Sequence, residues 1–278
     1  MGLTIIQVDA FTDRPFAGNP AAVCVTDEPL EEGLMQAIAA EMNLSETAFV
    51  CPIEGGYSLR WFTPATEVDL CGHATLASAH VLWSEGHLTP EAVARFKTRS
   101  GWLSASKKGS WIEMDFPAQP VTVTSYVAPE LIKSLCCGGN IRTVAKNDVN
   151  YLIELQSEKV LRTLEPDFVE IKKLPLQGII ATATADSDQY DFVSRYFAPA
   201  VGINEDPVTG SAHTSLAPYW QEKLGKSTML AQQLSERGGI VRVQCKLPES
   251  NTTSASNENR ILISGQAITT LKGNLLAY

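Results

Sequence analysis

Two glycines each stand at the start of a predicted helix, in the segments Gly72-His73-Ala74 and Gly210-Ser211-Ala212. The first N–H groups of a helix have no partners within the helix, and the helix dipole makes this end positive. A glycine there lets a ligand approach the backbone closely. Either glycine alone could be an ordinary turn residue. The occurrence of two at equivalent places favours binding of a carboxylate or another anion.

A third candidate is Glu46, which opens a predicted strand over residues 47–52 whose two faces are both apolar. A carboxylate at the entrance of such a strand is poorly hydrated, a condition that suits a general base. The alternative is a solvated glutamate at the end of the preceding helix. The spacing alone does not decide between the two.

Asp206 precedes the second predicted helix, and Ser211 lies in its first turn, at the place that His73 has in the first helix. An acid before a helix is most often a helix cap or a turn residue, which is the alternative to a catalytic role for Asp206. A helix N-terminus disfavours the charged form of histidine. The pattern therefore predicts a neutral His73 that donates or accepts hydrogen bonds, the alternative being a buried histidine with a structural role.

Metal and nucleotide sites lack their sequence signatures. The six cysteines show no C-x-x-C spacing, and the four histidines match no zinc motif, so we expect no metal. No G-x-G-x-x-G segment follows a strand, and the P-loop-like segment Gly225-Lys226-Ser227-Thr228 has Trp220 where a P-loop needs glycine. We therefore expect no nucleotide cofactor.

The length and the charge restrict the function further. A chain of 278 residues with 44% hydrophobic and 19% charged residues is typical of a globular protein of two domains. The net charge of −9 opposes binding to nucleic acid or to anionic membranes. The N-terminal segment lacks the basic region of a secretory signal, and no apolar stretch reaches the ~20 residues of a membrane span. We expect a cytoplasmic protein.

Strand signals dominate the chain, since short β-branched or aromatic segments recur along it. The segments lie at 4–10, 22–26, 47–52, 57–62, 111–116, 150–155, 178–185, 240–246 and 260–264. The segment 31–42 has the apolar stripe of a surface helix, with Asn43 suited to its C-terminal end. The segment 73–83 carries no formal charge, which predicts a helix buried on all sides with strands wrapped around it.

Prolines at 117, 120 and 129 make the middle of the chain rich in turns, which predicts a domain boundary there. We expect one domain over 1–118 and another over 119–278, with a last strand that can return to the first domain. The polar segment 249–258 is expected to be an exposed hairpin loop.

An internal repeat supports two related halves. Arg60-Trp61-Phe62-Thr63-Pro64-Ala65 matches Arg195-Tyr196-Phe197-Ala198-Pro199-Ala200 at an offset of 135. The helix-opening glycine follows twelve residues after Arg60 and fifteen residues after Arg195. Three extra residues are therefore expected in the second loop. Pro218 lies inside the second predicted helix, where it should kink or end it.

Six sequence blocks resemble the PhzF family, the phenazine biosynthesis-like proteins. They are Val8-Asp9-Ala10-Phe11-Thr12, Phe16-Ala17-Gly18-Asn19-Pro20-Ala21, Asn43-Leu44-Ser45-Glu46-Thr47-Ala48-Phe49, Phe62-Thr63-Pro64, Cys71-Gly72-His73-Ala74-Thr75 and Glu205-Asp206-Pro207-Val208-Thr209-Gly210-Ser211-Ala212. The resemblance implies an α+β fold like that of diaminopimelate epimerase. In this fold two pseudo-symmetric domains each have a mostly antiparallel sheet rolled around a central helix, and the active site lies between them.

The resemblance also implies a homodimer without cofactor or metal and an isomerase acting on a small carboxylic acid. Carried over to this chain, Glu46 takes the role of the proton shuttle, first base and then acid. His73, Asp206 and Ser211 take the roles that orient the substrate and assist the transfer. The last group, Asn19, Gly72 and Gly210, would line the carboxylate end of the site.

Two alternatives remain beside the isomerase. Epimerase relatives use two thiols, one before each helix-opening glycine. Here Cys71 has one of these places but Thr209 has the other, which disfavours a racemase or epimerase with two bases. The second alternative is a protein that keeps the fold, binds a partner protein and has little or no catalysis.

Overall fold

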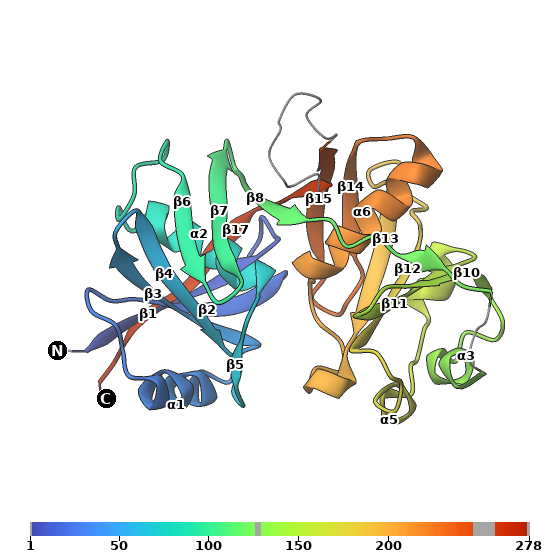
Figure 1. Cartoon of the computed structure of the whole chain (residues 1–278), viewed down its shortest axis with the longest axis horizontal. Helices are drawn as coiled ribbons and strands as arrows, with labels where there is room; N and C mark the ends of the chain where they lie inside the picture. The colour runs from blue at the N-terminus through green and yellow to red at the C-terminus, as the bar shows by residue number, and fades with distance from the viewer. Residues whose placement is uncertain (1, 126–128, 247–258, 277–278) are drawn as a thin grey trace. The chain divides into compact units, whose positions relative to one another are not determined.

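The computed structural model describes residues 2–125, 129–246 and 259–276, so the predicted loop at 249–258 lies outside the described residues. The chain forms two compact units (Figure 1). Unit 1 comprises Met1–Phe116 and Leu262–Tyr278, and unit 2 comprises Pro117–Ile261. The C-terminal segment thus belongs to unit 1.

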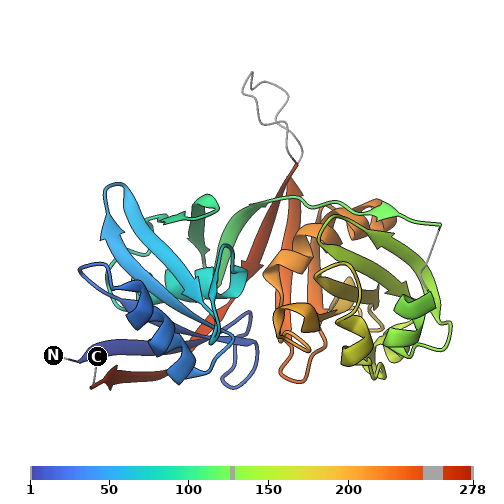
Figure 2. The same ribbon diagram turned by 60° about the horizontal axis from the view of Figure 1, so that its bottom comes forward.

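The described residues of unit 1 form two helices and a sheet of mostly antiparallel strands. The helices are α1 (Glu32–Met42) and α2 (Gly72–Ser84). The strands are β1 (Leu3–Ala10), β2 (Asn19–Val25), β3 (Glu46–Ile53), β4 (Gly56–Phe62), β5 (Glu67–Val68), β6 (Ala94–Thr98), β7 (Gly101–Lys108), β8 (Trp111–Pro117) and β17 (Ala267–Leu275), while β16 (Arg260–Gly265) crosses from unit 2 into unit 1. The first and last strands, β1 and β17, pair antiparallel and lie side by side in Figure 2.

Unit 2 contains the remaining elements. Its strands are β9 (Thr122–Val123), β10 (Ile141–Lys146), β11 (Asn150–Leu155), β12 (Gly178–Thr184), β13 (Phe192–Phe197), β14 (Thr228–Gln233) and β15 (Gly239–Lys246). Its helices are α3 (Pro129–Leu135), α4 (Glu158–Arg162), α5 (Phe168–Ile171), the 3-10 turn η1 (Pro199–Val201) and α6 (Gly210–Leu224).

The two units repeat one order of strand pairing. In unit 1, β1 with β2, β3 with β4, and β6 with β7 pair antiparallel, whereas β2 with β3 and β4 with β6 pair parallel. In unit 2, β10 with β11, β12 with β13, and β14 with β15 pair antiparallel, whereas β11 with β12 and β13 with β14 pair parallel. The expected duplication and the α+β fold class are thus confirmed within each unit.

Helix α2 is the centre of unit 1, as its uncharged sequence predicted. It packs against β1, β2, β3, β7 and β17, and most of its side chains are buried, from Ala74 to Trp83. Its small residues allow this close packing, because alanine and serine keep the helix backbone near the strands. Helix α1 instead buries one stripe, with Met35 and Ile38 against the core and Asn43 in the left-handed conformation (φ 50°) at its end.

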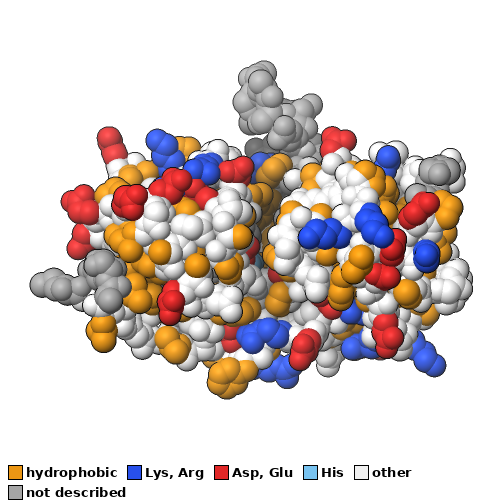
Figure 3. Space-filling view, turned by 90° about the horizontal axis from the view of Figure 1, so that it is seen from below, with side chains coloured by type: hydrophobic (Ala, Val, Ile, Leu, Met, Phe, Trp, Pro, Cys, Tyr) orange, Lys and Arg blue, Asp and Glu red, His pale blue; other side chains and the backbone are white. Residues whose placement is uncertain are grey.

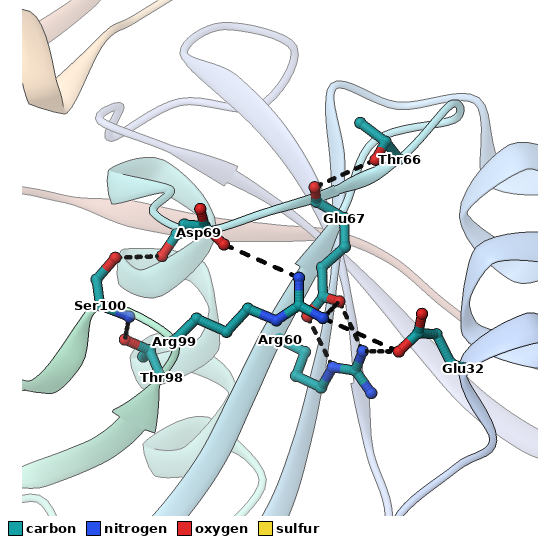
Figure 4. Close-up of polar contacts among 8 residues, drawn as sticks. All are labelled: Glu32, Arg60, Thr66, Glu67, Asp69, Thr98, Arg99 and Ser100. Atoms are coloured by element: carbon teal, nitrogen blue, oxygen red, sulfur yellow. Dashed lines mark hydrogen bonds and ion pairs between the residues drawn. The ribbon is translucent and has the colours of Figure 1, made fainter.

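The repeated arginine makes the same contacts in both units. Arg60 forms a two-pronged ion pair with Glu67, at 2.7 and 2.6 Å (Figure 4). The Arg60 guanidinium also lies over the Phe62 ring. Arg195 forms the same pair with Glu205, at 2.7 and 2.8 Å, and lies over the Phe197 ring.

The glutamates are 138 positions apart, whereas the arginines are 135 positions apart. The three extra residues of the second copy therefore lie between β13 and Glu205, where the chain forms η1.

Pro218 was expected to kink or end the second helix; the expected end is wrong, because α6 continues through Pro218 to Leu224. A proline has no N–H for the carbonyl four residues earlier, which here is that of Thr214. The backbone N–H of Gln119 donates to this carbonyl at 3.1 Å. The carbonyl that Pro218 leaves unpaired within the helix is thus satisfied by the segment that begins unit 2.

Charges of both signs are interspersed on the face seen in Figure 3, on unit 1 and on unit 2. Among the described residues, no helix is both long and apolar enough to cross a membrane.

Candidate active site

Asn19 is the first residue of β2 and is completely buried. It follows Gly18, which has a positive φ of 67° and packs so closely that a Cβ atom would lie 2.2 Å from the Ala10 carbonyl oxygen. Only glycine fits this turn. The turn delivers the Asn19 amide to His73, where its Nδ2 lies 3.2 Å from the imidazole Nδ1.

Glu46 is the first residue of β3 and is 7% exposed. The left-handed Asn43 ends α1, and the short turn after it carries the chain directly into β3. Parallel pairing with β2 places Glu46 opposite Ala21. Glu46 is therefore a buried side chain at the start of an apolar strand and not a solvated glutamate at the end of the helix.

His73 lies in the first turn of α2 and is 5% exposed. Its Nε2 is 3.0 Å from Glu46 Oε2, and the Cys71 Sγ is 3.5 Å from its Nδ1. Cys71 is the N-cap residue of α2, yet its side chain makes no capping hydrogen bond. Unit 1 thus brings together Asn19, Glu46 and His73, with Gly72 opening the helix beside them.

The direction of the His73 pKa shift is opposite to the one that the helix dipole predicted. Burial alone would lower the pKa of His73, but its interactions with the neighbouring Cys71 and Glu46 raise this pKa well above its usual 6.5. Burial, together with the charge of Glu46, raises the pKa of the Cys71 thiol to about 11. The thiol is therefore protonated at neutral pH.

In unit 2, the loop before α6 is held by side-chain hydrogen bonds. The Thr209 hydroxyl donates to Asp206 Oδ2. The Gln233 amide accepts from the Thr209 N–H at 2.9 Å and donates to the Asp206 carbonyl at 2.8 Å and to the Thr209 hydroxyl at 3.2 Å. The helix begins at Gly210 with Thr209 as its N-cap residue, so the alternative that Asp206 caps the helix is wrong.

His213, one turn into α6, is fully buried and donates from Nδ1 to the Thr209 carbonyl at 2.8 Å. Its Nε2 is buried without a hydrogen-bond partner in the described structure. Burial lowers the pKa of His213 to about 4, so this ring is neutral at pH 7.

The predicted site residues therefore fall into two groups, one in each unit. Asn19, Glu46, Gly72 and His73 are brought together in unit 1. Asp206 and Gly210 lie at the start of α6, and Ser211 follows them with an exposed side chain.

Sequence reasoning missed Gln233, which reaches the Asp206 loop from β14. No spacing signal could have found it, because the contact spans 27 residues. It also missed that Cys71, two residues before His73, joins Glu46 and His73 in one cluster whose nitrogen, oxygen and sulfur atoms lie within 4.8 Å of one another.

Comparison with known proteins identifies the family. Residues 8–273 match the family described as phenazine biosynthesis-like protein, PhzC-PhzF. The chain belongs to this family. An uncharacterized isomerase of Halalkalibacterium halodurans is 50% identical over 276 residues, with 99% of each chain covered. A crystal structure of a PhzF family phenazine biosynthesis protein from Enterococcus faecalis has a TM-score of 0.90 and 42% identity, with both chains fully covered.

A predicted epimerase of Pseudomonas aeruginosa has a TM-score of 0.74 with 21% identity, covering 99% of this chain and 100% of its own, which shows a likeness of fold alone. The expected family, the epimerase-like fold and the enzyme class, an isomerase, are confirmed by these matches.

Proposed function

We propose that this isomerase moves a proton within a small carboxylic acid, with Glu46 as the single group that removes the proton and returns it. The observation that carries the proposal is the buried pair of Glu46 and His73, whose Oε2 and Nε2 atoms are 3.0 Å apart. A carboxylate with few water molecules around it can accept a proton from carbon without first losing a hydration shell. The same carboxylic acid can then return the proton to another carbon on the same face.

His73 supports this cycle electrostatically. Its pKa is raised by the neighbouring Cys71 and Glu46, so the ring is suited to hold a proton next to the Glu46 side chain. The N-terminus of α2 starts at the adjacent Gly72. Its N–H groups suit the carboxylate of the substrate and the negative charge that develops when a carbon loses its proton.

The environment of the other acidic groups supports one base rather than two. The Cys71 thiol is held protonated by burial and by Glu46. At the equivalent place in unit 2, the Thr209 hydroxyl already donates to Asp206 and accepts from Gln233. Neither group is a ready base at neutral pH, which supports a proton shift over a two-base racemisation.

For unit 2 we propose that Asp206 and Ser211 orient polar groups of the substrate. The hydrogen bonds from Thr209 and Gln233 support this role for Asp206, because they fix the loop that carries it. Ser211 has an exposed side chain in the first turn of α6. A cofactor-free reaction, a homodimer in solution and a cytoplasmic location remain predictions that accompany this proposal.

The test is proton exchange in heavy water over a panel of small cyclic acids, unsaturated acids and amino acids, followed by NMR or mass spectrometry. We expect Glu46→Gln to lower the rate of deuterium incorporation by about 100-fold or more while leaving the thermal unfolding temperature near that of the wild type. A matched control is Glu67→Gln, which removes another poorly exposed carboxylate paired with a cation in the same unit. Exchange at the wild-type rate in Glu46→Gln contradicts the role of Glu46.

A further inference from the structure

We propose that Gln233 is a positioning residue of the candidate active site, which directs the Thr209 hydroxyl and so holds Asp206 as a hydrogen-bond acceptor. This inference rests on the proposed function, in which Asp206 orients polar groups of the substrate. Gln233 is the last residue of β14, and its side chain is completely buried. Its hydrogen bonds are therefore shielded from water.

The orientation of the Gln233 amide is fixed by its partners. Its oxygen accepts from the Thr209 N–H at 2.9 Å, and its nitrogen donates to the Asp206 carbonyl at 2.8 Å and to the Thr209 hydroxyl at 3.2 Å. The reverse orientation would place two donors against each other, the amide nitrogen and the Thr209 N–H. One amide thus ties together the two ends of the loop 206–209 in a single arrangement.

This arrangement also sets the direction of the Thr209 hydroxyl. A hydroxyl has one proton to donate, and its oxygen here accepts a hydrogen bond from Gln233. Its own proton is donated to Asp206 Oδ2. Gln233 therefore acts on the Asp206 carboxylate through Thr209 and keeps that carboxylate oxygen an acceptor.

A serine two residues after this position makes the same contact in both units. In unit 2 the Ser235 hydroxyl donates to the Pro207 carbonyl at 2.6 Å, and in unit 1 the Ser100 hydroxyl donates to the Asp69 carbonyl at 2.8 Å (Figure 4). The serines are 135 positions apart and their acceptors are 138 positions apart, as are the repeated arginines and their glutamates. The serine contact thus belongs to the fold that the two units share.

The glutamine contact belongs to unit 2. The strand equivalent to β14 is β6, which ends at Thr98, 135 positions before Gln233. The Thr98 hydroxyl donates to the Gly101 carbonyl at 2.8 Å, within the turn between β6 and β7. The shared fold therefore does not require the Gln233 amide, which is present in the unit that carries Asp206.

The first test is Gln233→Met, which keeps the length of the side chain and removes its three hydrogen bonds. We expect the variant to exchange deuterium into the substrate at least about tenfold more slowly, because a small displacement of Asp206 misaligns the substrate. Gln232→Met is the matched control, since Gln232 is the neighbouring glutamine on β14 and is partly buried. A wild-type rate in folded Gln233→Met, or an equal loss in Gln232→Met, overturns the inference.

The variant Gln233→Glu distinguishes positioning from a loss of stability. An ionised carboxylate cannot donate to the Thr209 hydroxyl, whereas the protonated acid can donate to it and still accept from the Thr209 N–H. The exchange rate relative to that of the wild type should therefore rise as the pH falls from about 9 to about 5, the range in which a buried glutamate titrates. A ratio that is independent of pH overturns the role of Gln233. This variant keeps the test decisive if Gln233→Met does not fold.

Hydrogen exchange of the Thr209 backbone amide, measured by NMR, needs no enzyme activity. It should be at least about tenfold faster in Gln233→Met than in the wild type, because the N–H loses its acceptor. Equal protection of this amide overturns the inference. If Glu46→Gln keeps the wild-type rate of substrate exchange, the role of Glu46 fails, whereas a slower rate in Gln233→Met still supports the positioning of Asp206.

Discussion

The Thr209 hydroxyl donates a hydrogen bond to Asp206 at the place where unit 1 has the Cys71 thiol. The two positions correspond in the internal repeat, since each precedes the glycine that opens a central helix. In unit 1 this side chain adjoins the ion pair of His73 with Glu46, whereas in unit 2 it holds an acidic loop in place. The side chain at this equivalent position therefore has different contacts and a different role in each half.

Replacing Thr209 by valine keeps the shape of the side chain and removes its hydroxyl. The Asp206 carboxylate then loses a donor, and the Gln233 amide loses an acceptor, in a buried site. We expect the free energy of unfolding to fall by about 1–3 kcal/mol, together with a slower proton exchange because the Asp206 loop loosens. Urea unfolding and exchange rates measure the two effects. Thr209→Ser keeps the hydroxyl and should stay close to the wild type; equal losses in both variants would contradict the hydrogen-bond explanation.

His213 makes the protein less stable in acid. Its pKa is about 4 in the folded protein and 6.5 without the burial. Above pH 6.5 the ring is neutral in both states and its stabilising contribution is complete. As the pH falls from 6.5 towards 4, the unfolded chain binds a proton that the folded protein does not. The free energy of unfolding therefore falls by up to about 3 kcal/mol.

His213→Gln should therefore flatten the decline of the unfolding temperature between pH 6.5 and 4. His87→Gln, at an exposed histidine, is the control and should keep the wild-type profile. An unchanged slope in His213→Gln would show that other groups cause the acid sensitivity.

The two repeated arginines, Arg60 and Arg195, should differ in how much they contribute to the free energy of unfolding. The Arg195 side chain is 11% exposed and also donates to the carbonyls of Leu161 and Leu164. Arg195→Met leaves Glu205 and these carbonyls without their cation, so we expect a loss of about 3 kcal/mol in the free energy of unfolding.

The Arg60 side chain is 31% exposed, and a second cation, Arg99, lies 2.5 Å from Glu67 (Figure 4). Glu67 therefore keeps a cationic partner when Arg60 is replaced. Solvent screening and the second cation reduce the expected cost of Arg60→Met to about 1 kcal/mol. Chemical denaturation of both variants compares them directly, and a larger loss for Arg60→Met would reverse this ranking.

The contact between Gln119 and Thr214 predicts coupling with Pro218. Gln119→Pro removes the N–H that satisfies the Thr214 carbonyl and should destabilise the protein. Pro218→Ala supplies an N–H within the helix that can replace it. A double-mutant cycle measured by urea denaturation should therefore show a coupling energy of about 1 kcal/mol. Strictly additive effects would mean that the linker contact does not compensate for the proline.

Local patterns in the sequence predicted several parts of the fold. The uncharged segment from 73 to 83 required burial on all sides, and α2 lies among five strands. The matched segments that begin at Arg60 and Arg195 revealed the duplication. Residues that pack in the same way in both halves need similar side chains, so the repeat can be seen in the sequence.

Strands β7 and β17 are among the strands that were not predicted. Their side chains are largely polar or exposed, as in Gly101–Lys108, so their sequences lack the alternating apolar pattern of a strand. Pairing with neighbouring strands, and not this local pattern, determines their structure.

The sequence alone determined which residues could do chemistry, since Glu46 at an apolar strand and glycines at two helix starts are local features. Only the tertiary structure decided the pKa values and the hydrogen-bond partners of these residues. It placed Cys71 and Glu46 against His73, which raises the pKa of the imidazole where the helix dipole alone predicted a lowered one. It also placed Gln233 on the Asp206 loop. Charge and hydrogen bonding act through space, so groups that are distant in the chain set these properties, and no local pattern records them.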